Sequence, residues 1–143
     1  MTTRKLKNET ALLREAIEAG NLGHLVTINP DGSPQMSAVL VGLEDDEVVS
    51  AHLGVYQKVR NIRRDPRVVL SMEPGGMDAR GFAHFLVVHG TARITEGGAP
   101  DLLKRLTHQY YGDVPFPDTS RMPPGYITRI TVDRIAGAGP WVQ

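Results

Sequence analysis

Hydrophobic and polar residues change their spacing several times along the chain, and each spacing predicts a different element. In residues 8–20, Leu13, Ala16 and Ile17 fall on one face, charged residues lie off it, and Gly20 offers a C-terminal stop, which predicts a helix. Beyond this segment the apolar residues alternate or form short runs, as they do in β-strands. The predicted strands are residues 22–28, 36–43, 48–53, 68–72, 81–95 and 126–135.

Turn-forming residues separate these strands. Residues 29–33 read NPDGS, which supplies the Pro, Asp and Gly of a hairpin turn. The four acids of residues 44–47 predict a solvated turn, because they lack the ordered Asp/Asn/Gly spacing of a calcium-binding EF-hand loop. Gly90, inside the extended run 81–95, predicts a bulge or a sharp bend.

Two further helices are predicted, over residues 56–65 and 99–110. Pro66 ends the first, because a residue before proline is pushed out of the helical region. Residues 112–125 contain four prolines and form a loop of restricted conformation. We expect one domain over residues 1–143, mainly β with flanking helices. Strands that are adjacent in sequence and joined by short turns favour an antiparallel sheet closed into a barrel over βαβ units.

Composition excludes several classes of function. The 143 residues carry 16 Lys and Arg against 16 Asp and Glu, so the net charge is zero, which argues against a nucleic-acid or anionic-membrane binder. The chain is 41% hydrophobic without any apolar stretch that approaches the roughly 18–20 residues needed to span a bilayer, so we expect a soluble, cytoplasmic protein. It has no cysteine, and its five histidines show no metal-ligand spacing, so we expect no metal site.

Chain length limits where a large ligand could bind. A chain of this size buries only about two-thirds of its unfolded surface, so it has little interior to spare for an enclosed cavity. A large ligand would therefore lie in a groove or between two subunits. A Rossmann site is excluded, because no G-x-G-x-x-G follows a strand and opens a helix.

The most unusual segment is residues 58–67, which holds five of the 16 basic residues. On a helix, Lys58 and Asn61 share one face. Lys58 would lie in the first turn, where free backbone N–H groups and the helix dipole favour an anion, and Arg60 could add a two-pronged contact. Two interpretations stay open on spacing alone: a solvated basic face, or an anion site.

Several segments together resemble a known family. They are GHLVTI at 23–28, DGSPQMSAV at 31–39, VVSA at 48–51, KVRNIRRDPRV at 58–68 and GTARI at 90–94. In these segments the chain resembles the split β-barrel flavin-reductase superfamily that includes the pyridoxamine-phosphate oxidases. Within it, the chain is most similar to the F420 (deazaflavin)-dependent reductases of actinobacteria. The resemblance implies a six-stranded antiparallel split β-barrel that forms a homodimer, with cofactor sites at the subunit interface.

The resemblance also assigns cofactor contacts by position. These are Gln35, Ser37, Val39, Ala51, His52, Lys58, Arg60, Asn61, His84 and Trp141. Lys58, Arg60 and Asn61 match the positions that hold the cofactor phosphate. His84 and Trp141 would reach the site from the partner subunit.

The cofactor expected from the resemblance is F420, with FMN as the alternative. FMN-using relatives place basic residues in the second strand, whereas residues 35–41 carry no charge here. An uncharged strand beside a basic helix suits the longer anionic tail of F420. The reaction expected is hydride transfer between reduced F420 and a small conjugated, unsaturated or quinone-like substrate.

The residues that would serve the substrate are less specific. Met36, Phe82 and Trp141 are candidates for an apolar pocket at the ring face, or for ordinary packing. His52, Tyr126 or water could supply a proton. Two alternative functions remain: a non-catalytic protein that binds or stores F420, a flavin or heme, and an FMN-dependent enzyme like the pyridoxamine-phosphate oxidases.

Overall fold

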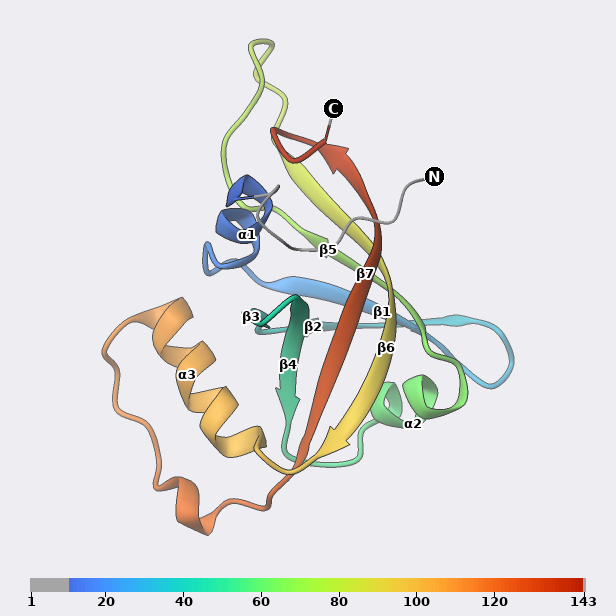
Figure 1. The fold of residues 1–143 in the computed structure, drawn as a ribbon, viewed down its shortest axis with the longest axis vertical. Coiled ribbons are helices and arrows are strands. Elements are labelled where there is room, and N and C mark those ends of the chain that lie inside the picture. The colour runs from blue at the N-terminus through green and yellow to red at the C-terminus, as the bar shows by residue number, and fades with distance from the viewer. Residues whose placement is uncertain (1–10, 143) are drawn as a thin grey trace.

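A computed structural model describes residues 11–142 as a curled antiparallel sheet with three helices around it (Figure 1). The strands are β1 (Gly23–Ile28), β2 (Pro34–Val39), β3 (Gly42–Glu44), β4 (Glu47–His52), β5 (Arg67–Met72), β6 (Phe85–Glu96) and β7 (Tyr126–Ala138). The helices are α1 (Ala11–Ile17), α2 (Gln57–Arg64) and α3 (Ala99–Tyr111), with a short 3₁₀ helix η2 (Thr119–Arg121). The expected class, mainly β with flanking helices, is therefore confirmed. Residues 8–10 of the predicted first helix lie outside the described residues.

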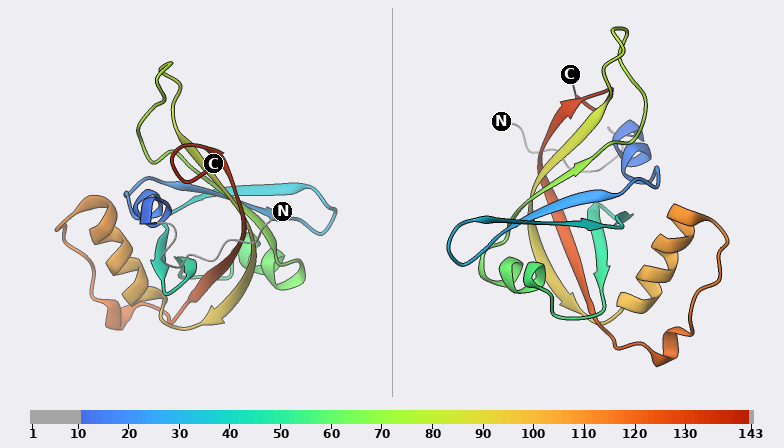
Figure 2. Two further views of the ribbon diagram at one scale, coloured as in Figure 1. Left: turned by 45° about the horizontal axis from the view of Figure 1, so that its top comes forward. Right: turned by 180° about the vertical axis from the view of Figure 1, so that it is seen from behind.

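The seven strands form one sheet in the order β2-β1-β5-β6-β7-β4-β3. Each pair of neighbours is antiparallel, as the short turns predict. The two long strands β6 and β7 cross the molecule side by side, and the sheet curls so that β2 and β3 approach one another (Figures 1 and 2).

One predicted strand is divided in two. The sequence pattern predicts a single strand over residues 36–43, but β2 ends at Val39 and β3 begins at Gly42. Between them, helix α3 takes the backbone hydrogen bonds: Val41 N–H donates to Tyr110 Oη (2.8 Å), and Gln109 Nε2 donates to the Val41 carbonyl (3.0 Å). The observed sheet thus has seven strands where six were expected, and it is open, because β2 and β3 are its two edges.

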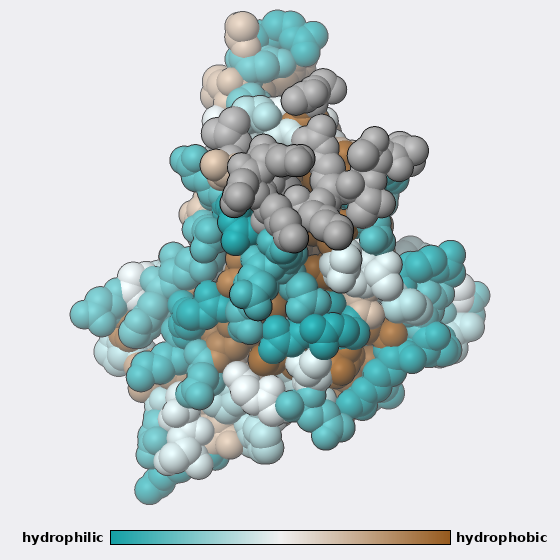
Figure 3. Space-filling model, in the orientation of Figure 1, coloured by the Kyte–Doolittle hydropathy of each residue, from teal (hydrophilic) through white to brown (hydrophobic). Residues whose placement is uncertain are grey.

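The interior of the curled sheet is apolar. Leu25, Leu70, Met72, Leu86 and Val88 point inward from three central strands and are at most 1% exposed. These positions alternate with outward-facing ones, as half-buried strands require. Figure 3 shows the opposite character outside, where hydrophilic residues dominate the face seen in Figure 1.

The helices cover different parts of this sheet. Helix α3 packs against β4 through buried Leu102 and Leu106, which form a second cluster with Val49 and Ile127. Helix α2 lies against β1 and β6, as its position below the β1–β2 hairpin in Figure 1 shows. No helix among the described residues is long and apolar enough to cross a membrane.

The bulge predicted at Gly90 is confirmed. The pairing of β6 with β7 shifts register between His89 and Gly90. A Cβ atom at Gly90 would lie 2.5 Å from Ile130 Cγ2 and 2.6 Å from the Thr131 carbonyl oxygen, so β7 approaches too closely for any side chain.

The acidic turn is also confirmed. Glu44 pairs with Glu47 at the ends of the β3–β4 hairpin, and Asp45 has a φ of 54°. Glu44 bonds to Arg105 and Arg129, and Glu47 bonds to Arg93. Glu44 and Glu47 are therefore neutralised by arginines. No group of three or more potential metal ligands occurs in the described part of the chain.

Candidate functional site

Helix α2 directs Lys58 toward β2. The helix follows Gly54 and Val55, and its N-cap residue Tyr56 gives no side-chain cap to the first turn. Arg60 links the helix to the segment before it, because its guanidinium donates to the Val55 carbonyl (3.0 Å). Lys58, in the uncapped first turn, donates from Nζ to Ser37 Oγ at 3.4 Å. The positive end of the helix and a lysine therefore lie beside an uncharged strand.

A cavity of about 220 Å³ adjoins Lys58; we call it the α2 pocket. Its lining residues come from β2, β4, α2, α3 and the segments between them. They are Ala38, Val39, Leu40, Ala51, His52, Leu53, Tyr56, Lys58 and Leu103. Five of the residues predicted from the resemblance thus meet here, since Ser37 joins the four that line the pocket through its contact with Lys58.

Lys58 is half-buried, and its surroundings disfavour its charge. Burial lowers the pKa of its ammonium group. Lys58 Nζ contacts the Ser37 hydroxyl and the face of the Tyr56 ring, whose centroid lies 5.5 Å away. No carboxylate forms an ion pair with Lys58 among the described residues. An anion in the α2 pocket would supply the missing counter-charge.

His52 forms a polar part of the pocket wall. It is only 3% exposed, its Nε2 lies 2.6 Å from Thr128 Oγ1 and 3.4 Å from Ser50 Oγ, and its ring meets Tyr56 edge-on. Burial, assisted by the charge of Lys58, lowers the pKa of His52 to about 4. The imidazole is therefore neutral near pH 7, so it can form hydrogen bonds but is a weak acid for proton transfer.

The other cations of α2 already have partners. Arg63 pairs with Glu96 (3.6 Å) and lies over the Tyr126 ring, while Arg67, just beyond the helix, pairs with Asp65 at 2.7 Å. For these two arginines, the solvated-face interpretation fits. Arg60 instead binds uncharged acceptors, the Val55 carbonyl and Gln57 Oε1. It is exposed and carries a charge that no carboxylate in the described structure pairs with.

Asn61 and Gln35 belong to a different set of contacts, one helical turn further along. Asn61 is completely buried, and its Nδ2 donates to Thr27 Oγ1 (3.0 Å) and Asn29 Oδ1 (2.9 Å). Thr27 donates in turn to Gln35 Oε1 (3.0 Å). We call Thr27, Asn29, Gln35 and Asn61 the anchor network.

The amide oxygen of Asn61 is occupied as well. It accepts hydrogen bonds from Gln57 Nε2 (2.8 Å) and Arg64 (3.4 Å), and Arg64 also bonds to the Ile28 carbonyl. The network fastens α2 to β1. In this arrangement Asn61 has no free amide group for a phosphate, and its predicted cofactor contact remains a prediction.

The remaining predicted residues lie elsewhere in the subunit. His84 and Trp141 pack edge to face, with ring centroids 5.8 Å apart, beside a cavity of about 200 Å³ near α1. Met36 and Phe82 are each 64% exposed, whereas Trp141 is 6% exposed. Within one subunit, none of these four residues lines the α2 pocket.

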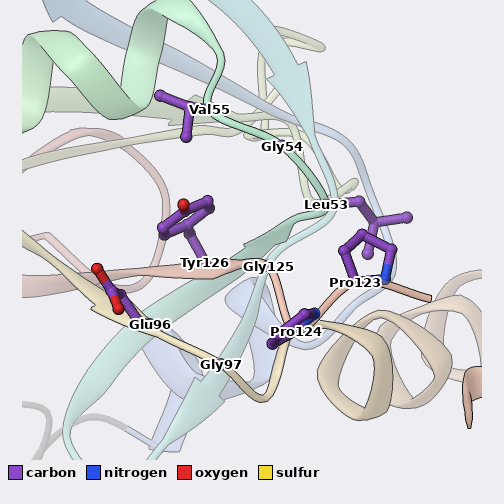
Figure 4. Close-up of a pocket in the computed structure, with 9 residues that line it drawn as sticks. All are labelled: Leu53, Gly54, Val55, Glu96, Gly97, Pro123, Pro124, Gly125 and Tyr126. Atoms are coloured by element: carbon purple, nitrogen blue, oxygen red, sulfur yellow. The ribbon is translucent and has the colours of Figure 1, made fainter.

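Tyr126 lines a separate and larger cavity of about 440 Å³ (Figure 4). The other residues around it are Leu53, Gly54, Val55, Glu96, Gly97, Pro123, Pro124 and Gly125. Leu53 lies between this cavity and the α2 pocket, because it lines both. The two candidate proton donors, His52 and Tyr126, are therefore in different cavities.

Sequence reasoning missed seven residues of the site. Five line the α2 pocket, namely Ala38, Leu40, Leu53, Tyr56 and Leu103, and two contact His52, namely Ser50 and Thr128. Tyr56 has a local signal, because it immediately precedes the basic helix and supplies its N-cap. Ser50 and Thr128 have none, since their strands come together only through the pairing of β4 with β7. Leu103, from helix α3, lies at the pocket wall.

Comparison with known proteins agrees with this fold. An F420 reductase has 24% sequence identity and a TM-score of 0.70, over 86% of this chain and 94% of that one. A conserved hypothetical protein from Mycobacterium tuberculosis also has 24% identity and a TM-score of 0.70, over 96% and 88% of the two chains. HupZ from Group A Streptococcus has 18% identity and a TM-score of 0.62, over 92% and 95%. At these identities the likeness shows a shared fold.

The sequence itself identifies the family. No curated protein matches the chain. The sequence profile described as pyridoxamine 5′-phosphate oxidase, in contrast, matches residues 10–138, which is nearly the whole chain. The chain therefore belongs to the pyridoxamine 5′-phosphate oxidase family, within the flavin-reductase superfamily and with the fold of the F420 reductase.

Proposed function

We propose that this member of a flavin-binding oxidoreductase family uses F420 and transfers a hydride between it and a small conjugated, unsaturated or quinone-like substrate. The observation that carries the proposal is Lys58: a half-buried ammonium at the start of α2 without a carboxylate partner in the described residues. An anionic cofactor tail would provide that partner. Arg60 and the free N–H groups of the first helical turn would add to its binding.

The α2 pocket suits a flat ring attached to such a tail. Its walls include the apolar residues Val39, Leu40, Leu53 and Leu103, and no carboxylate lines it. Strand β2, which faces Lys58, carries no charged residue over Pro34–Val39. A second phosphate-binding cation on this strand, as expected for FMN, is therefore missing, which supports F420 over FMN.

Pocket size supports a site that is completed by a second subunit. Pockets that enclose drug-sized ligands have volumes of about 300–1,000 Å³. The α2 pocket, at about 220 Å³, would hold only part of a cofactor. We infer that the chain forms a homodimer, in which His84 and Trp141 from one subunit approach the α2 pocket of the other. In such a dimer, the open sheets of the two subunits would pack together and complete the split β-barrel that the resemblance implies.

The outer face of the sheet offers a surface for this dimer. Val26 and Val69 pair across β1 and β5 with only partly buried side chains, next to a cavity of about 340 Å³. At the margins of this face, Met36 is 64% exposed and Phe85 is 43% exposed. Exposed apolar side chains that gather on one face are typical of an interaction surface.

When bound, F420 supplies the hydride chemistry through its deazaflavin ring. The protein would then bind, orient and exclude water. Lys58 would hold the anionic tail, Leu53 and Leu103 would exclude water from the ring, and His52 would form a neutral hydrogen bond at the ring edge. Such preorganised contacts stabilise charge that develops during transfer.

Separate titrations of the purified protein with F420 and with FMN test the proposal. We expect F420 to bind in the micromolar range and FMN to bind more weakly, measured by quenching of cofactor fluorescence. FMN binding without F420 binding would contradict the proposal. If F420 binds but no quinone, enone or tetrapyrrole oxidises its reduced form, the storage function is supported instead.

A further inference from the structure

Two hydroxyl groups converge on a single nitrogen inside the sheet. Ser50 and Thr128 are paired residues of β4 and β7, 4% and 0% exposed, and both approach Nε2 of His52. The Thr128 contact is short, at 2.6 Å, and the Ser50 contact is long, at 3.4 Å. For each hydroxyl, His52 is the one side-chain hydrogen-bond partner in the described structure.

A proton count at this cluster selects one form of the imidazole. A neutral imidazole carries one proton, on Nδ1 or on Nε2. If Nε2 were protonated, it would donate to Thr128, and neither buried hydroxyl proton would have a side-chain acceptor. If Nε2 is unprotonated, the Thr128 hydroxyl donates to it and is satisfied. Because an unpaired buried donor is costly, the second arrangement is favoured, with the proton of His52 on Nδ1.

Nδ1 of His52 is the ring nitrogen that no hydrogen bond engages in the described structure. The one fully buried side-chain nitrogen or oxygen without a hydrogen-bond partner, among the described residues, is Nε1 of Trp141. Nδ1 of His52 also has no partner in the structure, but this atom is not fully buried, so solvent reaches it. The α2 pocket is the cavity that His52 lines, so an acceptor for the Nδ1–H group would lie there.

We propose that Thr128 is a positioning residue that holds His52 in the Nδ1–H form, so that His52 presents a neutral hydrogen-bond donor to an acceptor atom of the bound ligand. This inference rests on the proposed function for the identity of the ligand, a ring whose edge carries carbonyl oxygens. A ring edge that presents an N–H group to this position is disfavoured, because two donors would then face each other. His52 thereby selects the orientation of the ring and does not transfer a proton.

The form of His52 is tested directly in the ligand-free protein. Long-range ¹H–¹⁵N NMR spectra distinguish a protonated from an unprotonated ring nitrogen for each histidine, and His52→Gln assigns the signals. We expect Nδ1 of His52 to be protonated and Nε2 unprotonated at pH 7. A proton on Nε2 would overturn the proposal.

Three variants separate a positioning role from a structural one. Thr128→Val keeps the shape and removes the hydroxyl proton, so a mixture of the two imidazole forms is expected. Thr128→Ser restores a hydroxyl and should restore the Nδ1–H form. Ser50→Ala is the matched control, which removes a buried hydroxyl at the longer distance and should leave the Nδ1–H form predominant. An unchanged His52 spectrum in Thr128→Val would contradict the proposal, and the native spectrum decides the question should that variant not fold.

Cofactor binding gives the second readout. Thr128→Val is expected to weaken F420 binding about 3–10-fold, the range for one hydrogen bond between uncharged groups, whereas Thr128→Ser binds as the native protein does. Unchanged binding in Thr128→Val would overturn the role of the hydrogen bond. If the native protein has the Nδ1–H form but does not bind F420, the proposed function fails and the assignment of His52 stands.

Discussion

The two turns of helix α2 differ in whether their polar side chains already have partners. Asn61, in the second turn, is completely buried, and four hydrogen bonds occupy its amide. Two join it to the anchor network, and two come from Gln57 and Arg64. Lys58, in the first turn and on the same face, has one long hydrogen bond and a lowered pKa. Strand β2 shows the same division. Gln35 belongs to the anchor network through Thr27, whereas Ser37 contacts Lys58.

This difference separates a structural role from a binding role. A buried polar group with all its partners present fixes the position of the elements that it joins. A cation without a counter-charge gains most from a ligand that supplies one. The anchor network therefore places α2, and the placed helix presents Lys58 to the α2 pocket. Four changes test this division.

The largest expected effect is on stability, from Asn61→Ala. This substitution removes the donor to the buried Thr27 hydroxyl oxygen and to the Asn29 amide oxygen and opens a cavity, so we expect the free energy of unfolding to fall by about 3–5 kcal/mol. Urea unfolding measures the change. Lys58→Ala is the matched control one turn away and should change stability by less than about 1 kcal/mol. Equal losses in the two variants would refute the division.

The next effect is on the pH dependence of stability, through protonation of His52 in the wall of the α2 pocket. The folded pKa of His52, about 4, is below its ordinary value of 6.5, so between these pH values the unfolded chain binds more protons. The free energy of unfolding should therefore fall by roughly 3 kcal/mol as the pH falls from 6.5 to 4. Unfolding curves of the native protein and of His52→Gln measure this contribution. The same pH dependence in both proteins would show that His52 is not its source.

Removal of the cation should reduce cofactor binding more than stability. Lys58→Ala is expected to weaken F420 affinity by about 1.5–3 kcal/mol, the range for a hydrogen bond to a charged group. Fluorescence titration at low and high salt measures the loss, which should shrink as salt screens the charge. Native affinity in Lys58→Ala would return the first turn of α2 to the solvated-face interpretation.

The smallest effect is expected from Arg67→Ala, the control for loss of a positive charge near the same helix. The Arg67 side chain is 75% exposed and already pairs with Asp65. Exposed ion pairs of this kind contribute about 0–1 kcal/mol to stability. F420 affinity should change less than about twofold, because a charge that is solvent-exposed and already paired attracts an anion only weakly. A loss as large as that of Lys58→Ala would mean that the general basic charge, and not Lys58 itself, attracts the cofactor.

Local pattern determined much of the fold and part of the site. Alternating apolar residues and the turns at residues 29–33 and 44–47 specify strands and hairpins through neighbours in sequence, and the structure has them at these places. The shared face of Lys58 and Asn61 follows from helical spacing alone. Gly90 marks its bulge because no other residue fits there.

Tertiary structure decided which of these side chains remain available to a ligand. Partners distant in sequence make the difference: Asn61 meets Thr27 across 34 positions, and Thr128 meets His52 across 76. Tyr110 and Gln109 of α3 divide the strand predicted over residues 36–43 by binding Val41 from 69 and 68 positions away. Spacing along the chain specifies the face of an element on which a side chain lies. Only the packing of distant elements specifies whether that side chain is already satisfied, and for this reason Lys58 and Asn61, equivalent in the sequence pattern, have different roles in the folded protein.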